Sequence, residues 1–222
     1  MGISLAEALE RISASATKVD LAQSKIGDEG AKQLAAALQS NASVLVLNLE
    51  NNSIGDDGVS YLAAMLECNS SLHMLQLASN GIGNKGAKSL AAVLERNTSL
   101  NTLDLQNNRI GDEGASYFAE MLERNSSLHT LYLWENRIGD EGTRSLAAMM
   151  QRNTSLNTLD LQSNCIYADG ARYLAAMLER NSSLHTLYLW GNSIREELST
   201  VANTSTLTRA PMHWSSRCRC RE

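Results

Sequence analysis

The stretch that decides the fold is residues 100–127, LNTLDLQNNRIGDEGASYFAEMLERNSS, one copy of a unit that recurs every 28 residues. Each copy opens on the pattern LxxLxLxxNxI. The opening residues are Val44, Leu72, Leu100, Leu128, Leu156 and Leu184. A fixed period of this length indicates a solenoid, in which each repeat stacks on its neighbours, rather than one globular core.

The first part of each unit predicts a short strand. Leu103 and Leu105 alternate with polar residues, so both leucines are expected to point inward. Asn108 ends the strand, and the same position is filled along the chain by Asn52, Asn80, Asn136, Asn164 and Asn192, with Ser24 in the first copy. We expect this asparagine ladder to be structural, because an amide can satisfy backbone groups of a turn that leucines cannot.

The second part of the unit predicts a helix on the other side of the core. Gly111 suits a turn and Asp112 is expected to cap the helix that follows. Apolar residues then follow at helical spacing, namely Ala115, Phe118, Ala119 and Leu122. Asn125 fits a left-handed residue that stops the helix.

Neither the strand nor the helix can bury its apolar side alone, so stacked repeats must share one continuous core. Parallel strands lie ~4.8 Å apart, whereas helices need ~8–10 Å, so the strands are expected on the concave face of a horseshoe. We therefore predict an α/β fold, a right-handed βα solenoid over residues 1–202. The strands are expected near residues 18–22, 46–50, 74–78, 102–106, 130–134, 158–162 and 186–190.

These motifs resemble the leucine-rich repeats of the ribonuclease inhibitor and NOD-like receptor subclass, over about residues 4–194. The 28-residue period and the segment IGDEGAxxLAxxLExN, as at residues 110–125, carry the resemblance. It implies a horseshoe used mainly for protein recognition, without naming the partner, because similar repeats serve inhibitors, receptors and GTPase activators.

Charge and cysteine content narrow the class of partner and the compartment. The chain has 222 residues and a formal net charge of −5; because residues 203–222 hold four Arg and one Glu, the repeats alone are near −8. An acidic body argues against binding nucleic acid through phosphates. The four cysteines, Cys68, Cys165, Cys218 and Cys220, are irregularly placed, unlike the paired caps of extracellular repeats. Free thiols favour the cytosol or nucleus, and we predict a cytoplasmic protein.

Both ends of the array depart from the pattern. Residues 1–12 have Leu5, Leu9 and Ile12 at helical spacing with charges between them, which predicts a helix covering the first strand rather than a signal peptide. No stretch is long enough to span a membrane.

After Ile194 the pattern is lost, so we expect an uncapped apolar edge that could support an oligomer, and a poorly ordered basic tail at 203–222.

Outside the LxxLxLxxNxI pattern, Asn-x-Ser sequences also recur, seven times. Taken alone they indicate N-glycosylation. Their asparagines are Asn41, Asn69, Asn97, Asn125, Asn153, Asn181 and Asn203. Six of them lie at the position where the helix ends and the return turn begins, which explains them without a glycan.

A second period of 56 residues marks the candidate binding site. Residues 100–138 and 156–194 are identical at 29 of 39 positions. Over these repeats the sequence of the predicted strand alternates between NTLDLQ and HTLYLW. Residues between the inward leucines point out of the concave face. The predicted partner-binding residues are Asp104, Gln106, Tyr132, Trp134, Glu135, Asp160, Gln162, Tyr188 and Trp190.

This patch combines aromatic and acidic side chains, which favours a protein partner with a basic or mixed surface. We expect the two tyrosines and two tryptophans to be exposed ~10 Å apart on alternate strands, with Asp104 and Asp160 solvated between them. The alternative is that duplication copied a surface with no binding role.

We predict no enzyme activity, catalytic residue, cofactor or metal. His73, His129 and His185 recur 56 residues apart, too far to share a metal. Cys218 and Cys220 form at most an incomplete site. The repeats also resemble Ran GTPase-activating protein, which offers an alternative function with Arg109 and Arg137 as contacts; a structural scaffold is a third.

Overall fold

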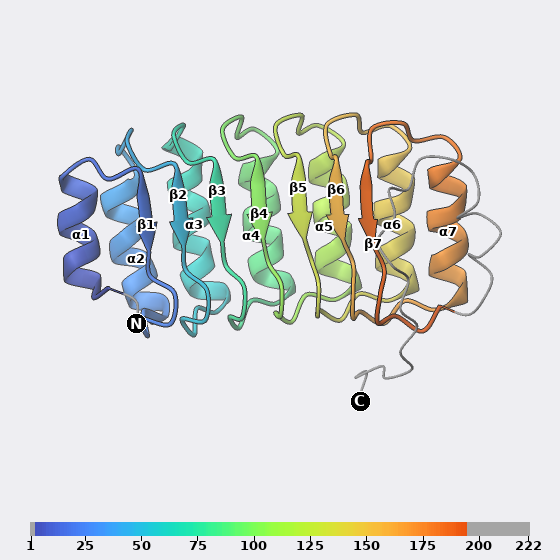
Figure 1. Cartoon of the computed structure of the whole chain (residues 1–222), viewed down its shortest axis with the longest axis horizontal. Coiled ribbons are helices and arrows are strands. Elements are labelled where there is room, and N and C mark those ends of the chain that lie inside the picture. Colours follow the sequence, from blue (N-terminus) through green and yellow to red (C-terminus); the bar gives the residue numbers. More distant parts are fainter. Residues whose placement is uncertain (1–2, 195–222) are drawn as a thin grey trace.

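The computed structural model of the chain describes residues 3–194, and within them strands and helices alternate in two layers (Figure 1). The strands are β1 Lys18–Asp20, β2 Val46–Asn48, β3 Met74–Gln76, β4 Thr102–Asp104, β5 Thr130–Tyr132, β6 Thr158–Asp160 and β7 Thr186–Tyr188. The helices are α1 Leu5–Ser13, α2 Gly27–Leu38, α3 Asp56–Cys68, α4 Asn84–Leu94, α5 Asp112–Leu122, α6 Asp140–Met150 and α7 Ala168–Leu178. This is the predicted βα solenoid.

The strands form one parallel sheet in the order β1 to β7, each paired with the strand of the next repeat. The register follows the 28-residue period, so Leu103 lies beside Leu131 and Leu131 beside Leu159. Residues at the same position of successive repeats therefore form straight rows across the strand face.

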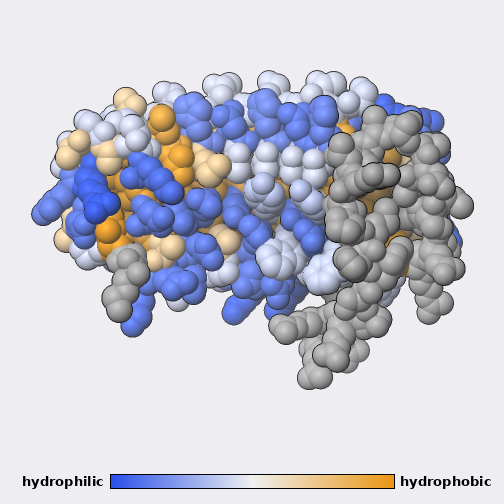
Figure 2. All heavy atoms as spheres, viewed as in Figure 1, coloured by the Kyte–Doolittle hydropathy of each residue, from blue (hydrophilic) through white to orange (hydrophobic). Residues whose placement is uncertain are grey.

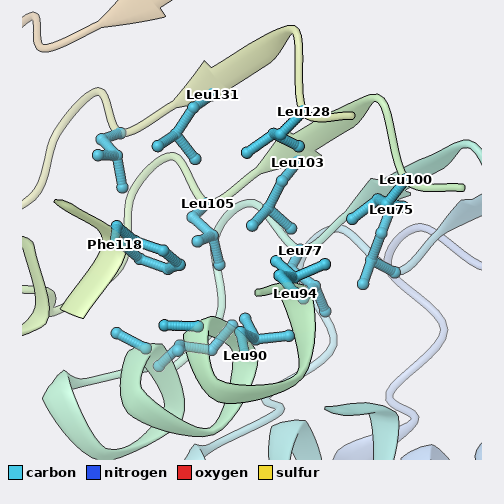
Figure 3. Packing of buried hydrophobic residues seen from close by; sticks show 14 of the residues in the cluster. Leu75, Leu77, Leu90, Leu94, Leu100, Leu103, Leu105, Phe118, Leu128 and Leu131 are labelled. Atoms are coloured by element: carbon cyan, nitrogen blue, oxygen red, sulfur yellow. The ribbon is translucent and has the colours of Figure 1, made fainter. Parts of the chain in front are cut away.

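The core lies between the sheet and the helices and runs through the whole array (Figure 3). Leu103 and Leu105 are fully buried, and Phe118 of α5 is the largest fully buried side chain. Figure 3 shows Leu90 and Leu94 of α4 facing the leucines of the strands, as the apolar spacing predicts.

The strands are three residues long, not the five predicted. Asn107 has φ 50°, so the chain turns away just after the strand. Pairing nevertheless continues beyond β4, because Leu105 donates its N–H to Tyr132 O at 2.9 Å and Asn107 donates to Trp134 O at 2.8 Å. The residues past the strand thus keep the register of the sheet.

The left-handed residue lies after the strand rather than after the helix. Asn69, at the end of α3, has φ −79°, and Asn125 is not among the positive-φ residues. The prediction for Asn125 was therefore wrong. Its amide Nδ2 instead donates to Leu94 O at 2.6 Å and to Asn97 O at 3.0 Å, and its Oδ1 accepts the N–H of Leu128 at 2.8 Å. A buried amide engaged with the preceding repeat is a structural group.

The asparagine ladder is confirmed as scaffold. Asn136 Nδ2 donates to Leu105 O at 2.9 Å and Leu133 O at 3.1 Å, while its Oδ1 accepts the N–H of Ile110 at 3.0 Å. The two bonds to the preceding repeat recur at Asn52, Asn108 and Asn164. Each amide joins two repeats through backbone groups that would otherwise be buried without a partner.

The predicted N-terminal helix is present as α1. Ser4 caps it by accepting the N–H of Glu7 at 3.2 Å, and the helix packs against α2 and β1. At the other end of the described chain, Leu187 and Leu189 are only partly buried, whereas Leu159 and Leu161 are fully buried. The expectations for residues 195–202 and for the tail at 203–222 lie outside the described residues. Within 3–194 no helix combines the length and apolar character needed to cross a membrane.

Candidate functional site

The predicted binding residues lie on and just beyond β4 to β7. The register places Asp104 beside Tyr132, Tyr132 beside Asp160, and Asp160 beside Tyr188. Pairing between repeats continues beyond the ends of the strands, since Glu135 donates its N–H to Gln162 O at 2.9 Å. We call the nine predicted residues the aromatic–acidic patch. The register thus brings together a set that spans 87 positions of sequence, from Asp104 to Trp190.

The strand face changes character along the array (Figure 2). Apolar surface gathers toward the N-terminal strands, while hydrophilic residues and residues of near-neutral hydropathy cover the middle strands. Leu45, just before β2, is 39% exposed. Thr102 and Thr130 occupy the positions held by Val46 and Met74 in earlier repeats. The part of the aromatic–acidic patch on β4 and β5 therefore lies on the more polar part of this face.

Asp104 and Asp160 are buried, so the expectation that they are solvated was wrong. Asp104 is 7% exposed and Asp160 is 6% exposed. Gln106 donates to Asp104 through its N–H at 3.0 Å and its Nε2 at 2.8 Å. Gln162 makes the same bonds to Asp160, at 2.9 Å from its N–H and 3.0 Å from its Nε2 to Oδ2. Each aspartate is therefore hydrogen-bonded by the glutamine two residues after it in the chain.

Burial sets the protonation behaviour of the two carboxyls. Desolvation raises the pKa of Asp104 above its ordinary value, and the hydrogen bonds from Gln106 only partly oppose it. The pKa of Asp160 is raised in the same way, with a smaller upward contribution from the charge of Asp104. Desolvation also raises the pKa of Tyr132, which lies between them, followed by the effects of Tyr188 and both aspartates. The patch therefore holds negative charge at an energetic cost.

The two tryptophans differ in exposure, although the sequence predicts that both are exposed. Trp190 is 44% exposed. Trp134 is only partly exposed, and its Nε1 atom is buried without a hydrogen-bond partner. Tyr132 and Tyr188 are partly exposed as well. The exposed aromatic surface of the patch is therefore smaller than predicted and centres on Trp190.

Glu135 is the member of the patch that departs most from regular strand geometry. It has φ 53° and is partly exposed just beyond β5. The hydrogen bond from each glutamine to its aspartate could have been predicted from the spacing Asp-x-Gln, since residues two apart in a strand share a face and a glutamine can reach back to a carboxylate.

The arginines of the alternative site occupy neighbouring loops. Arg109 and Arg137 are exposed, and Arg137 donates its N–H to Ile110 O at 2.8 Å, which holds the two loops side by side. His73 and His129 are exposed, with ring Nδ1 atoms near Ser71 O and Ser127 O.

The cysteines agree only in part with the expected free thiols. Cys68 is free and exposed. Cys165 is not a free thiol, and Cys218 and Cys220 lie outside the described residues. In the part of the chain that the structure describes, no group of three or more His, Cys, Asp or Glu side chains is placed to hold a metal ion.

Comparison with known families gives a match along most of the array. The family model described as "Leucine Rich repeat" matches six segments, namely residues 17–35, 40–63, 68–91, 96–119, 124–147 and 152–175. These segments make up more than half of the chain. No curated protein matches the sequence significantly.

Two solved structures are similar in shape and distant in sequence. "Leiomodin-1 Actin-Binding Site 2 (ABS2)" is 20% identical with a TM-score of 0.54, over 66% of this chain and 82% of that one. "Crystal structure of a plant ice-binding protein" is 18% identical with a TM-score of 0.46, over 71% of this chain and 44% of that one. At this identity the first likeness concerns the fold alone.

Proposed function

Because the chain belongs to the leucine-rich-repeat family, whose members generally mediate protein–protein interactions, we propose that it is a non-enzymatic module that binds a protein partner through the aromatic–acidic patch. The observation that carries the proposal is the alternation of acidic and aromatic side chains in register across β4 to β7. Tyr and Trp are enriched among residues that dominate binding energy at protein interfaces.

Trp190 is the centre of the proposed contact. It is 44% exposed, so a partner can bury a large apolar ring there. Asp104 and Asp160 add negative charge beside the rings, which favours a partner with a basic surface over one that is acidic. The acidic balance of the repeats disfavours nucleic acid.

We also propose that the repeats belong to the ribonuclease inhibitor and NOD-like receptor subclass and that the protein is cytoplasmic. The subclass is supported by the strict 28-residue period with a full helix in each repeat, such as α5 and α6. The location is supported by cysteine positions that lack the paired caps of extracellular repeats.

The proposal is tested by comparing the proteins captured from cell lysate by the native chain and by a Trp134→Ala, Trp190→Ala double variant. The matched control is Tyr61→Ala with Tyr173→Ala, which removes two exposed aromatics from α3 and α7, in the helix layer. We expect one partner to be lost with the tryptophans and kept with the control, at unchanged circular dichroism. Equal capture by all three proteins would contradict the proposal.

A GTPase-activating role is the second candidate, favoured by the exposure of Arg109 and Arg137 on adjacent loops. An Arg109→Ala, Arg137→Ala variant separates the two. Loss of stimulated GTP hydrolysis in this variant, with the tryptophan variant unaffected, would favour the loops as the site. A scaffold would instead bind several partners through the patch with little selectivity.

A further inference from the structure

Asp104 and Asp160 are buried anions without a cation. Neither takes part in an ion pair among residues 3–194; the pairs found there all join exposed or half-buried side chains elsewhere, such as Arg124 with Glu95. Their polar contacts are the neutral N–H groups of Gln106 and Gln162. A buried charge that is hydrogen-bonded but not neutralised destabilises the free protein.

A second group in the patch also lacks its partner. Trp134 lies between the two glutamine positions, and its Nε1 donor is buried and unpaired. An unpaired buried donor costs free energy, as an uncompensated carboxylate does. The patch therefore carries two energetic costs in the free protein, and a bound segment with cationic groups would relieve the first of them.

The two carboxylates belong to the same row of paired residues across the sheet, and β5 lies between their strands. Asp104 pairs with Tyr132 and Tyr132 pairs with Asp160, so two strand spacings separate the aspartates, or ~10 Å. Tyr188 continues the row beyond Asp160, so each carboxylate has an aromatic ring on the same side along the array.

We propose that the segment bound by the patch presents two arginine side chains ~10 Å apart, one to Asp104 and one to Asp160. This inference rests on the proposed function and names the chemistry of the partner. Arginine fits better than lysine because its guanidinium is weakly hydrated, donates several hydrogen bonds in one plane and stacks on aromatic rings. Tyr132 and Tyr188 supply those rings.

The ~10 Å spacing also indicates which backbone conformation of the bound segment can present the two arginines. In a polyproline II segment, residues i and i+3 lie on the same side and ~9.3 Å apart. In an extended strand, residues i and i+2 share a side but lie only ~6.6 Å apart. A peptide containing Arg-Pro-Pro-Arg therefore matches the two aspartates, and one containing Arg-Pro-Arg does not.

The test is isothermal titration of the full chain with three capped peptides whose centres are Arg-Pro-Pro-Arg, Lys-Pro-Pro-Lys and Arg-Pro-Arg. We expect the first to bind tightest and to weaken with added salt. An Asp104→Asn, Asp160→Asn variant should lose about tenfold or more in affinity, because each Asn keeps the shape and removes the charge. Each single variant should lose part of it.

The matched control is Glu123→Gln with Glu179→Gln. These residues are also 56 positions apart and exposed, but they lie at the ends of α5 and α7. This control removes the same charge and should leave the affinity unchanged. Equal binding of the three peptides, no binding of the first, or an equal loss in the control would overturn the pairing. If the tryptophan variant still loses its partner in that case, the patch remains the binding site and only the arginine chemistry fails.

Discussion

Asp112 begins α5 but caps α6: its Oδ1 atom accepts the backbone N–H of Gly142, in the next repeat, at 2.9 Å. The same oxygen accepts the N–H of Gly139 at 2.6 Å. The prediction that Asp112 caps its own helix was therefore wrong, since Gly111 holds that position without a side-chain bond. In α3 to α7, a free N–H group at the start of the helix is satisfied in this way by the preceding repeat.

This cap recurs along the array and explains why the motif GDEG needs its second glycine. The capping residues are Asp28, Asp56, Asn84, Asp112 and Asp140. A Cβ atom at Gly142 would lie 2.7 Å from Asp112 Oδ1 and 2.9 Å from its Cα. Aspartate and glycine thus form one contact between repeats, and α7 has Ala168 where α6 has Asp140.

Replacement of Asp112 by alanine should lower the free energy of unfolding by ~1–2 kcal/mol, because two helix N–H groups lose their acceptor. Asp112→Asn should cost much less, since Asn84 makes the same two bonds to Gly111 and Gly114. Urea denaturation followed by circular dichroism measures both. An equal loss in the two variants would show that the cap depends on charge rather than on the hydrogen bonds.

Replacement of Asn136 by alanine should be more costly, roughly 2–4 kcal/mol, because buried backbone groups of two repeats lose their partners. The Asn136 side chain donates hydrogen bonds to Leu105 O and Leu133 O and accepts one from the N–H of Ile110. Arg137→Ala, at the exposed neighbouring position, is the control and should change stability little. A small effect of Asn136→Ala in the same denaturation experiment would contradict the role of the ladder.

The buried carboxyls predict that stability falls as pH rises. The folded-state pKa of Asp104 and Asp160 is raised above the ordinary 3.8, so the penalty on the folded state develops as the pH rises from the ordinary to the raised values and is complete above them. The Asp104→Asn, Asp160→Asn variant should therefore melt a few degrees higher than the native chain at neutral pH.

That advantage should shrink on acidification and vanish below the ordinary pKa, where both carboxyls are protonated in both states. Melting curves across this pH range check the sign. Tyr132, which lies between the two aspartates and whose pKa is raised by burial, stays neutral there. A variant less stable than the native chain at neutral pH would mean that the carboxylates stabilise the fold.

The two tryptophans should differ in their effect on stability. Trp190→Ala should cost little, because the ring is 44% exposed, whereas Trp134→Ala removes more buried surface and should cost roughly 1–3 kcal/mol. Thermal unfolding of the single variants measures this. Loss of partner binding in Trp190→Ala alone would then report on the interface, since its fold is unchanged.

Within a single repeat, the sequence predicts the buried residues well and the length of the strand poorly. Leu103, Leu105 and Phe118 were predicted to be buried, because alternation and helical spacing directly report which side of an element faces the core. The role of Asn136 follows from the chemistry of an amide at a turn. The strand length was overestimated because residue type alone does not mark the left-handed turn: Asn107 tolerates that conformation, but Ser79, Glu135 and Ser163 adopt it at the same position of other repeats.

The sequence by itself determined the repeat, its register and the rows of residues on the strand face, because these depend only on the period and on alternation within each unit. Only the tertiary structure decided that Asp112 caps the following helix, that Asn125 bonds the preceding repeat, and that Asp104 and Asp160 are buried. The physical reason is the range of the interactions. A local pattern reports the inward side of one element, whereas the first two side chains bond atoms 30 and 31 residues away. Burial of the aspartates likewise depends on the neighbouring strands, which flank these positions only when the repeats stack.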